Sequence, residues 1–374
     1  MQRALTLRPF RPIYGAIARA WPAPADMIRH ASVSLPSEPA SSNAPSPARV
    51  WVVGAGGLLG RSVQRELGAD AWSFARSLPW HDLAQLHDQL RDAVHAFAAQ
   101  LQAEPGRAWS VAWCAGAGIV GTSARELEPE SRAFQRLLEL LSENRTLNAR
   151  LGAVSLASSA GGIYGGCKAD AISELTPPEP ISAYGRAKLE QEQMLDTWLT
   201  GQANVRGLIA RFSNLYGPAQ RLEKAQGLIS HISRCVIHGA PVHLYVPLDT
   251  VRDYLFADDA GRGLADGLRR ILPGTADQPQ SITKVYASEA EVSIAELLAI
   301  FRQITCQPVQ VVSAAHPTAA LQPPRLRFRS QVWPEPEDRV SLIDGVARVY
   351  REQRELFARG ALPPLSVQAA ARER

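Results

Sequence analysis

A strand-like run followed at once by a glycine-rich turn and a helix-like segment constrains the fold of this chain most. Residues 50–53 (VWVV) form a continuous apolar run, typical of a parallel strand buried on both faces of a sheet. The turn at 54–60 (GAGGLLG) comes next, and residues 61–67 have the composition of a helix. This order predicts the first strand–helix unit of a doubly wound sheet.

Similar apolar runs recur along the first half of the chain and predict further parallel strands. They lie at 111–115, 153–157 and 205–210, and segments with helical periodicity, such as 134–141, separate them. Strands that alternate with helices in this way predict an α/β chain with a Rossmann doubly wound parallel sheet. Beyond residue 211 the alternation gives way to shorter elements, among them a helix that begins with the capping box Ser293–Glu296.

Changes in composition and in hydrophobic periodicity divide the chain into four predicted parts. Residues 1–48 are rich in Pro, Ala, Ser and Arg and are expected to be a disordered N-terminal tail. Their Arg-rich, acid-poor composition also resembles an organelle transit peptide, and a misassigned start codon is a further explanation. Residues 49–211 form the predicted Rossmann dinucleotide-binding domain, and 212–350 a smaller C-terminal α/β substrate-binding lobe interleaved with the last Rossmann elements. A C-terminal helix and tail follow at 351–374.

Composition excludes several classes of protein. No apolar run approaches the roughly 18 residues that span a bilayer, so no membrane association is expected. The four cysteines are far apart and show no metal-binding or disulfide spacing, which fits a cytoplasmic protein without a metal site. The net charge is +4, but residues 1–48 hold five arginines against two acidic residues, so the remaining chain is nearly neutral and nucleic-acid binding is not expected.

The glycine turn has the features that a dinucleotide pyrophosphate requires. The pyrophosphate binds free backbone N–H groups at a helix N-terminus, after a tight turn that carries no obstructing side chain. The predicted cofactor-binding residues of the turn are Gly54, Gly57, Leu58, Leu59 and Gly60. Close packing of helix on strand would also select glycine, but the position directly after a strand favours cofactor binding.

The end of the second predicted strand bears on the choice between NAD and NADP. An acidic residue there bonds the ribose hydroxyls of NAD, whereas arginine accommodates the 2′-phosphate of NADP. Residues 71–74 (AWSF) lead to Arg76 and Ser77 without an acid, which modestly favours NADP. The alternative is that Arg76 is only a solvated surface residue.

A tyrosine four residues before a lysine places both side chains on one helix face. A nearby ammonium favours the phenolate, which can take a proton from a sugar hydroxyl while hydride leaves the same carbon. The chain has two such pairs, Tyr164/Lys168 and Tyr184/Lys188. Paired glycines follow Tyr164, whereas strong helix formers follow Tyr184, so Tyr184 and Lys188 are the predicted catalytic and cofactor-binding pair.

A hydroxyl at the end of the preceding strand completes the expected catalytic group. Ser158 and Ser159 lie there, and Ser159 is favoured as the catalytic, substrate-binding residue. The choice between the two serines remains open, because either could merely cap a turn.

The ordered motifs resemble the NAD-dependent epimerase/dehydratase family of extended short-chain dehydrogenases/reductases, which includes UDP-galactose 4-epimerase. Besides the glycine turn and Tyr184/Lys188, the resemblance covers Glu174 with the prolines at 177–178, RFSNLYGP at 211–218 and RDYLFADD at 252–259. It implies that Asn214 helps to hold a sugar-nucleotide substrate and that Arg252 contacts its diphosphate, although Arg252 could instead form an ion pair with Asp253. A homodimer is compatible with the resemblance.

The chain also departs from this family at three places. Ala160 and Gly161 stand where dehydratases carry an acidic pair, so dehydration is disfavoured. Residues 113–118 (WCAGAG) replace the usual His-x-Ala-Ala, and residues 287–292 lack a glycine turn, which leaves the nicotinamide pocket and the substrate in doubt.

Three functional hypotheses follow from the sequence. The first is an NAD(P)-dependent sugar-nucleotide epimerase that abstracts and returns hydride at a sugar carbon. The second is an NADPH-dependent reductase of a keto-sugar or another carbonyl compound. The third is a non-catalytic nucleotide-binding protein, against which the Tyr184/Lys188 pair argues.

Overall fold

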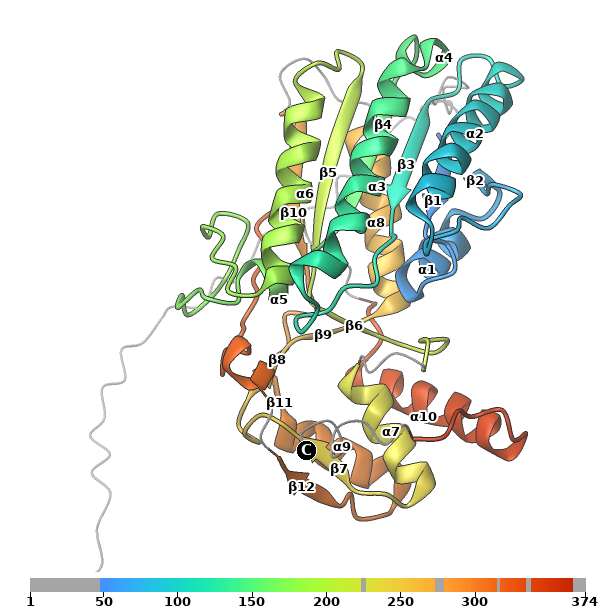
Figure 1. The fold of residues 1–374 in the computed structure, drawn as a ribbon. Coiled ribbons are helices and arrows are strands. Elements are labelled where there is room, and N and C mark those ends of the chain that lie inside the picture. Colours follow the sequence, from blue (N-terminus) through green and yellow to red (C-terminus); the bar gives the residue numbers. More distant parts are fainter. Residues whose placement is uncertain (1–47, 223–226, 273–278, 315–316, 334–337, 366–374) are drawn as a thin grey trace, which may run out of the picture. The chain divides into compact units, whose positions relative to one another are not determined.

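A six-stranded parallel sheet forms the centre of the molecule (Figure 1). The computed structural model describes residues 48–222, 227–272, 279–314, 317–333 and 338–365; of the predicted tail, 1–48, only Ala48 lies within them. The sheet has the order β10-β5-β4-β3-β1-β2. Its strands are β1 (Arg49–Val53), β2 (Ala71–Trp72), β3 (Trp109–Trp113), β4 (Gly152–Ser159), β5 (Val205–Phe212) and β10 (Ser281–Tyr286).

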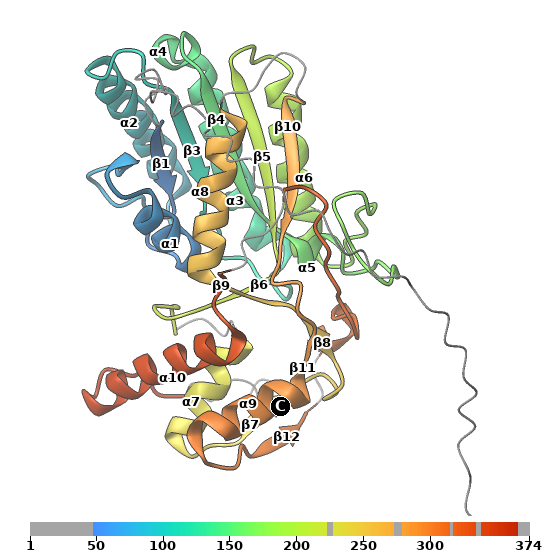
Figure 2. The ribbon, with the colours of Figure 1, turned by 180° about the vertical axis from the view of Figure 1, so that it is seen from behind.

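Helices cover both faces of this sheet, as Figures 1 and 2 show. One apolar core joins it to α2 (Leu83–Gln102), α3 (Ala124–Glu143) and α6 (Ala183–Leu199). A second core joins the opposite face to α1 (Leu58–Leu67) and α8 (Ala257–Ile271). The predicted Rossmann doubly wound fold is therefore confirmed.

The second half of the chain contributes to the sheet and also builds a smaller core. This smaller core is built from α7 (Leu228–His238), α9 (Ile294–Thr305), α10 (Leu342–Ala358) and β7 (Val242–Leu244). The exposed strand β12 (Val311–Ser313) pairs in parallel with β7. Two further short strand pairs are β6 (Asn214–Tyr216) with β9 (Tyr254–Phe256), and β8 (Val251–Arg252) with β11 (Val292–Ser293). The remaining elements are η1 (Gly68–Asp70), α4 (Arg145–Asn148), α5 (Ala160–Ile163) and η2 (Pro317–Leu321).

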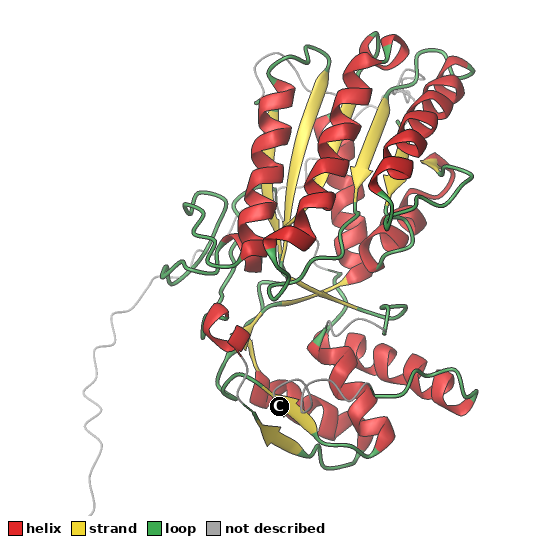
Figure 3. Ribbon diagram, in the orientation of Figure 1, coloured by secondary structure: helices red, strands yellow, loops and turns green. Residues whose placement is uncertain are grey.

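Local sequence signals locate most of these elements. Where the predicted and observed elements differ, the difference has a physical reason. The capping box predicted at Ser293 begins α9, and the Glu296 side chain accepts a hydrogen bond from the Ser293 N–H. Figure 3 distinguishes the helices from the strands of the fold. β10 was missed because it reads SITKVY, and its buried Lys284 is satisfied by Ser330 Oγ and the Val332 carbonyl oxygen. β2 is shorter than the run at 71–74 predicts.

The predicted internal boundaries do not separate compact units. Every described residue belongs to a single compact unit, so the boundary at 211/212 divides one body. Helix α10 begins at Leu342, so it crosses the boundary placed at residue 350. Among the described residues, no helix is both long and apolar enough to cross a membrane.

Candidate active site

The glycine turn between β1 and α1 has the close backbone contacts that its sequence predicts. Gly54 has φ +86°, and a Cβ there would lie 2.7 Å from the Ala115 nitrogen. A Cβ on Gly60 would lie 2.3 Å from the Gly54 oxygen. Gly57 caps α1 without a side-chain hydrogen bond, so the N–H groups of the first turn, at Leu58 and Leu59 among others, lack an intrahelical partner. A phosphate fits this cradle.

The segment after β3 connects the glycine turn with Tyr184 and Lys188. Its residue Ala115 touches Gly54, as the Cβ position shows. A Cβ on Gly116 would lie 3.5 Å from Lys188 Nζ, and one on Gly118 would lie 3.2 Å from the Tyr184 ring. The glycine turn and the predicted catalytic pair therefore border the same stretch of backbone, at the carboxyl ends of the strands.

Tyr184 lies in the first turn of α6, which Ser182 caps through the Gly185 N–H at 3.0 Å. Burial raises the pKa of Tyr184 to about 12. The negative charge of Glu130 adds to this rise, whereas a hydrogen bond with the Ser159 hydroxyl lowers the pKa. Tyr184 therefore needs additional positive charge nearby before it can act as a base at neutral pH.

Lys188 supplies positive charge one helical turn later. Only 5% of its surface is exposed, and Nζ donates hydrogen bonds to Gln191 Oε1 at 3.1 Å and to the Ala157 oxygen at 3.4 Å. Burial lowers the pKa of this ammonium group, and the charges of Glu130 and Glu192 oppose the effect. Within the described part of the chain two of the three Nζ protons are used, which leaves one for a ligand.

The two serines at the end of β4 point to different partners, as neighbouring residues of a strand do. Ser159 Oγ interacts with Tyr184 and also accepts a hydrogen bond from the Gly162 N–H at 3.1 Å. Ser158 Oγ donates to buried Glu192 at 2.6 Å. Geometry thus brings Ser159, and not Ser158, to the predicted catalytic tyrosine.

The alternative pair, Tyr164 and Lys168, occupies a structural position. Tyr164 is fully buried at the end of α5, and its hydroxyl donates to the Ser173 oxygen at 3.0 Å and accepts from the Arg211 guanidinium. Lys168 lies beyond the helix and is exposed. The glycines that argued against a helix at this point explain why the two side chains do not share one.

Asn214 and Arg252 lie close together beyond the carboxyl end of β5. Asn214 Nδ2 donates to the Asp253 oxygen at 3.0 Å. Arg252 is 9% exposed, and its acceptors among the described residues are neutral: the Val251 oxygen at 2.8 Å and Gln322 Oε1 at 3.4 Å. The alternative, an ion pair of Arg252 with Asp253, is not formed in the described part of the chain, where the Asp253 carboxylate binds Ser213 and Ser288. Asp258 and Asp259 lie in the first turn of α8.

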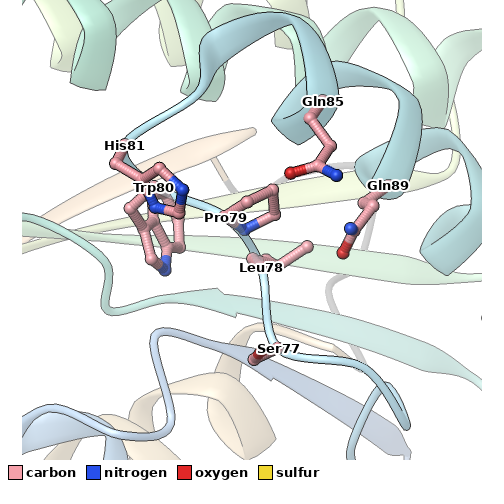
Figure 4. Close-up of a pocket in the computed structure, with 7 residues that line it drawn as sticks. All are labelled: Ser77, Leu78, Pro79, Trp80, His81, Gln85 and Gln89. Atoms are coloured by element: carbon pink, nitrogen blue, oxygen red, sulfur yellow. The ribbon is translucent and has the colours of Figure 1, made fainter.

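Arg76 lies apart from these residues, in the loop after β2. Its guanidinium pairs with Asp92 of α2, both side chains being half exposed, and lies 5.1 Å from the Phe74 ring centroid. The same loop borders an open pocket of about 640 Å³, which Figure 4 shows between Trp80 and His81 of the loop and two glutamines of α2. The pocket includes none of the predicted site residues.

Glu130, the acidic residue of α3 that lies nearest to Tyr184 and Lys188, is not predicted from the sequence. Its Oε1 accepts hydrogen bonds from the Ala117 N–H at 2.5 Å and the Gly118 N–H at 2.9 Å. In the sequence it is one of several acidic residues at the start of a helix, of which Glu126 and Glu128 are exposed. No local pattern separates it from them. Among the described residues, no group of side chains is arranged to hold a metal ion.

The chain is similar in sequence to curated proteins over part of its length. The chain is 30% identical over 99 residues to a dTDP-L-rhamnose 4-epimerase of Burkholderia thailandensis, a match that covers 26% of this chain and 27% of the relative. It is 30% identical over 107 residues to a dTDP-4-dehydro-6-deoxyglucose reductase of Escherichia coli, covering 28% of this chain and 33% of the relative. These matches thus span about a quarter to a third of the curated relatives.

The fold as a whole resembles a solved structure of MoeE5 in complex with UDP-glucose and NAD. The TM-score is 0.64 at 23% sequence identity, and the likeness covers 83% of this chain and all of that one. Residues 50–274, more than half of the chain, match the model of the NAD dependent epimerase/dehydratase family. The protein therefore belongs to the NAD dependent epimerase/dehydratase family.

Proposed function

We propose that this protein is a sugar-nucleotide epimerase that uses a nicotinamide cofactor. The observation that carries the proposal is the placement of Ser159, Tyr184 and Lys188 around the segment after β3, which also touches the glycine turn. A hydroxyl, a phenol and a buried ammonium beside a phosphate cradle suit proton transfer next to a dinucleotide.

The residues present fit a nicotinamide dinucleotide. The cradle has no room for a Cβ at Gly54 or Gly60, and the N-terminus of α1 carries no side-chain cap. When bound, the cofactor would accept hydride from a sugar carbon and return it to the other face. The preference for NADP rested on Arg76, whose ion pair with Asp92 competes with a 2′-phosphate. Because MoeE5 is described with NAD, we propose NAD as the cofactor.

The chain's own residues would move one proton. Tyr184 takes it from a sugar hydroxyl as hydride leaves and returns it when hydride comes back. The Ser159 hydroxyl hydrogen-bonds the same oxygen and orients it. Lys188 lowers the cost of the phenolate through its positive charge, which opposes the burial that raises the Tyr184 pKa to about 12. Because both the proton and the hydride return to the sugar, epimerisation consumes no cofactor.

A diphosphate-bearing substrate is supported by the positive charge around β8. Arg252 is buried, and in the part of the chain that the structure describes its acceptors are neutral, so its charge is available to an anion. Val251 bridges to Arg325, and three arginines, Arg325, Arg327 and Arg329, surround the single carboxylate of Glu291. We propose that Arg252 binds the diphosphate and that Asn214, which is exposed beside it, contacts the sugar nucleotide.

A second function, an NADH- or NADPH-dependent keto-sugar reductase, is favoured by the match to the dTDP-4-dehydro-6-deoxyglucose reductase. The same Tyr184 would then donate a proton while hydride adds to a carbonyl. The two functions differ in whether the cofactor is consumed, as in the reductase, or regenerated, as in the epimerase.

Turnover of the full-length protein with UDP-, dTDP- and GDP-sugars distinguishes them. The products are separated by chromatography, and NADH and NADPH are followed at their absorbance. An epimer formed without net cofactor consumption is expected. Stoichiometric consumption with keto-sugars would establish the reductase instead, and no turnover with any sugar nucleotide would contradict both.

A further inference from the structure

The carboxylate of Glu130 has one oxygen in use and one without a partner. Oε1 accepts from the two backbone N–H groups of Ala117 and Gly118. Oε2 is buried and has no hydrogen-bond partner among the described residues. Leaving a buried carboxylate oxygen unpaired is costly, so an interaction that compensates it is expected nearby.

Lys188 lies on the side of this unpaired oxygen. Helices α3 and α6 pack side by side on one face of the sheet (Figure 1). A Cβ on Gly116 would lie 3.4 Å from Glu130 Oε2 and 3.5 Å from Lys188 Nζ. The two charged atoms are therefore within about 7 Å of one another, a range over which buried charges interact appreciably.

Among the described residues, three other titratable groups face Lys188, but none of them offers an unpaired negative charge as Glu130 does. Glu192, on the same helix, is bound by the Arg211 guanidinium at 2.6 Å and by Ser158, so its charge is already paired. Cys114, after β3, has its pKa raised to about 12 by burial and is a neutral thiol. Tyr184 is neutral until it gives up its proton. Glu130 is left as the unpaired negative group.

We propose that Glu130 is a positioning residue that keeps the buried Lys188 ammonium charged and fixes the segment at 116–118 against it. The two oxygens divide these tasks, since Oε1 holds the backbone and Oε2 supplies the charge. The inference rests on the proposed function in one respect, the use of the Lys188 charge by Tyr184.

The low lysine content of the chain allows a direct test. The sequence holds four lysines, so protein labelled with [ε-¹³C]lysine gives four NMR signals, and the signal lost in Lys188→Met identifies Lys188. Glu130→Gln keeps an oxygen for the Ala117 and Gly118 N–H groups but removes the charge. Loss of a charge about 7 Å away in a buried site should lower the Lys188 pKa by about 1–2 units.

Matched variants separate charge from fold. Glu128→Gln removes an exposed carboxylate of the same helix that pairs with Arg132, and it should leave the Lys188 pKa unchanged. Glu130→Asp retains a negative charge, so the Lys188 pKa should lie between those of the wild type and Glu130→Gln. If Glu130→Gln does not fold, Glu130→Asp can be compared with the wild type instead. An unchanged Lys188 pKa in Glu130→Gln, or an equal fall in Glu128→Gln, would overturn the inference.

The pH profile of turnover links Glu130 to the reaction. The rate should rise as Tyr184 loses its proton and fall as Lys188 loses its own. The Glu130 charge raises both pKa values, so Glu130→Gln should move both limbs of the profile to lower pH. A merely structural role would lower the rate without moving the limbs. The NMR titration decides the inference about Glu130 even if the proposed epimerase activity is not found.

Discussion

Replacing Glu192 by alanine should destabilise the protein strongly, because it leaves a buried arginine without its counter-charge. Arg211 is 6% exposed and Glu192 is 2% exposed. The guanidinium reaches the carboxylate through Nε at 3.0 Å and through a second nitrogen at 2.6 Å, and Ser158 donates to the same carboxylate at 2.6 Å. Breaking a buried ion pair by removing one partner costs about 3–5 kcal/mol. We expect Glu192→Ala to lose that amount of unfolding free energy.

Urea unfolding followed by circular dichroism measures this loss. Glu190→Ala is the matched control, since Glu190 is an exposed acid on the same helix and should change stability by less than about 0.5 kcal/mol. A loss below about 1 kcal/mol in Glu192→Ala would show that water or another group compensates Arg211 and would refute the argument from burial.

Three further variants test the ligand sites. Gly60→Ala places a Cβ 2.3 Å from the Gly54 oxygen and should weaken dinucleotide binding in calorimetry by at least about 10-fold, whereas Gly56→Ala meets only an arginine side-chain nitrogen at 3.3 Å and should bind normally. Arg252→Gln should raise KM for a sugar nucleotide by about 10- to 100-fold with a smaller change in kcat, since one charged hydrogen-bonding group is lost. Arg76→Ala should alter NAD affinity little; a loss of 10-fold or more for NADP alone would reinstate NADP as the cofactor.

The sequence was sufficient for features that are encoded locally. The glycine turn, the helix that carries Tyr184 and the capping box at Ser293 each depend on residues within one or two turns of chain, and the structure has all three. The choice of Tyr184 over Tyr164 as the helix-borne tyrosine also followed from the glycines beside Tyr164.

Features that depend on contacts between distant segments could not be predicted from the local sequence. Glu130 is distinguished from Glu128 only by the backbone of a different segment, to which it is bonded. Ser158 and Ser159 are equivalent in sequence, and only the direction in which each points from β4 separates them. The ion pair between Arg76 and Asp92 joins a loop to α2, so the arginine could be noticed but its partner could not.

Turnover of Tyr184→Phe, compared with Tyr164→Phe, tests the central claim most directly. Both changes remove one hydroxyl from a tyrosine, which is fully buried at Tyr164 and partly buried at Tyr184. Among the described residues it is Tyr184 that contacts Ser159 and the segment beside Lys188. Tyr184→Phe should lower kcat by at least about 100-fold while the cofactor affinity stays within a few-fold of wild type. Tyr164→Phe should lose stability, by about 1–3 kcal/mol, and keep its turnover. Near-normal turnover in Tyr184→Phe, with the loss found in Tyr164→Phe instead, would contradict the account.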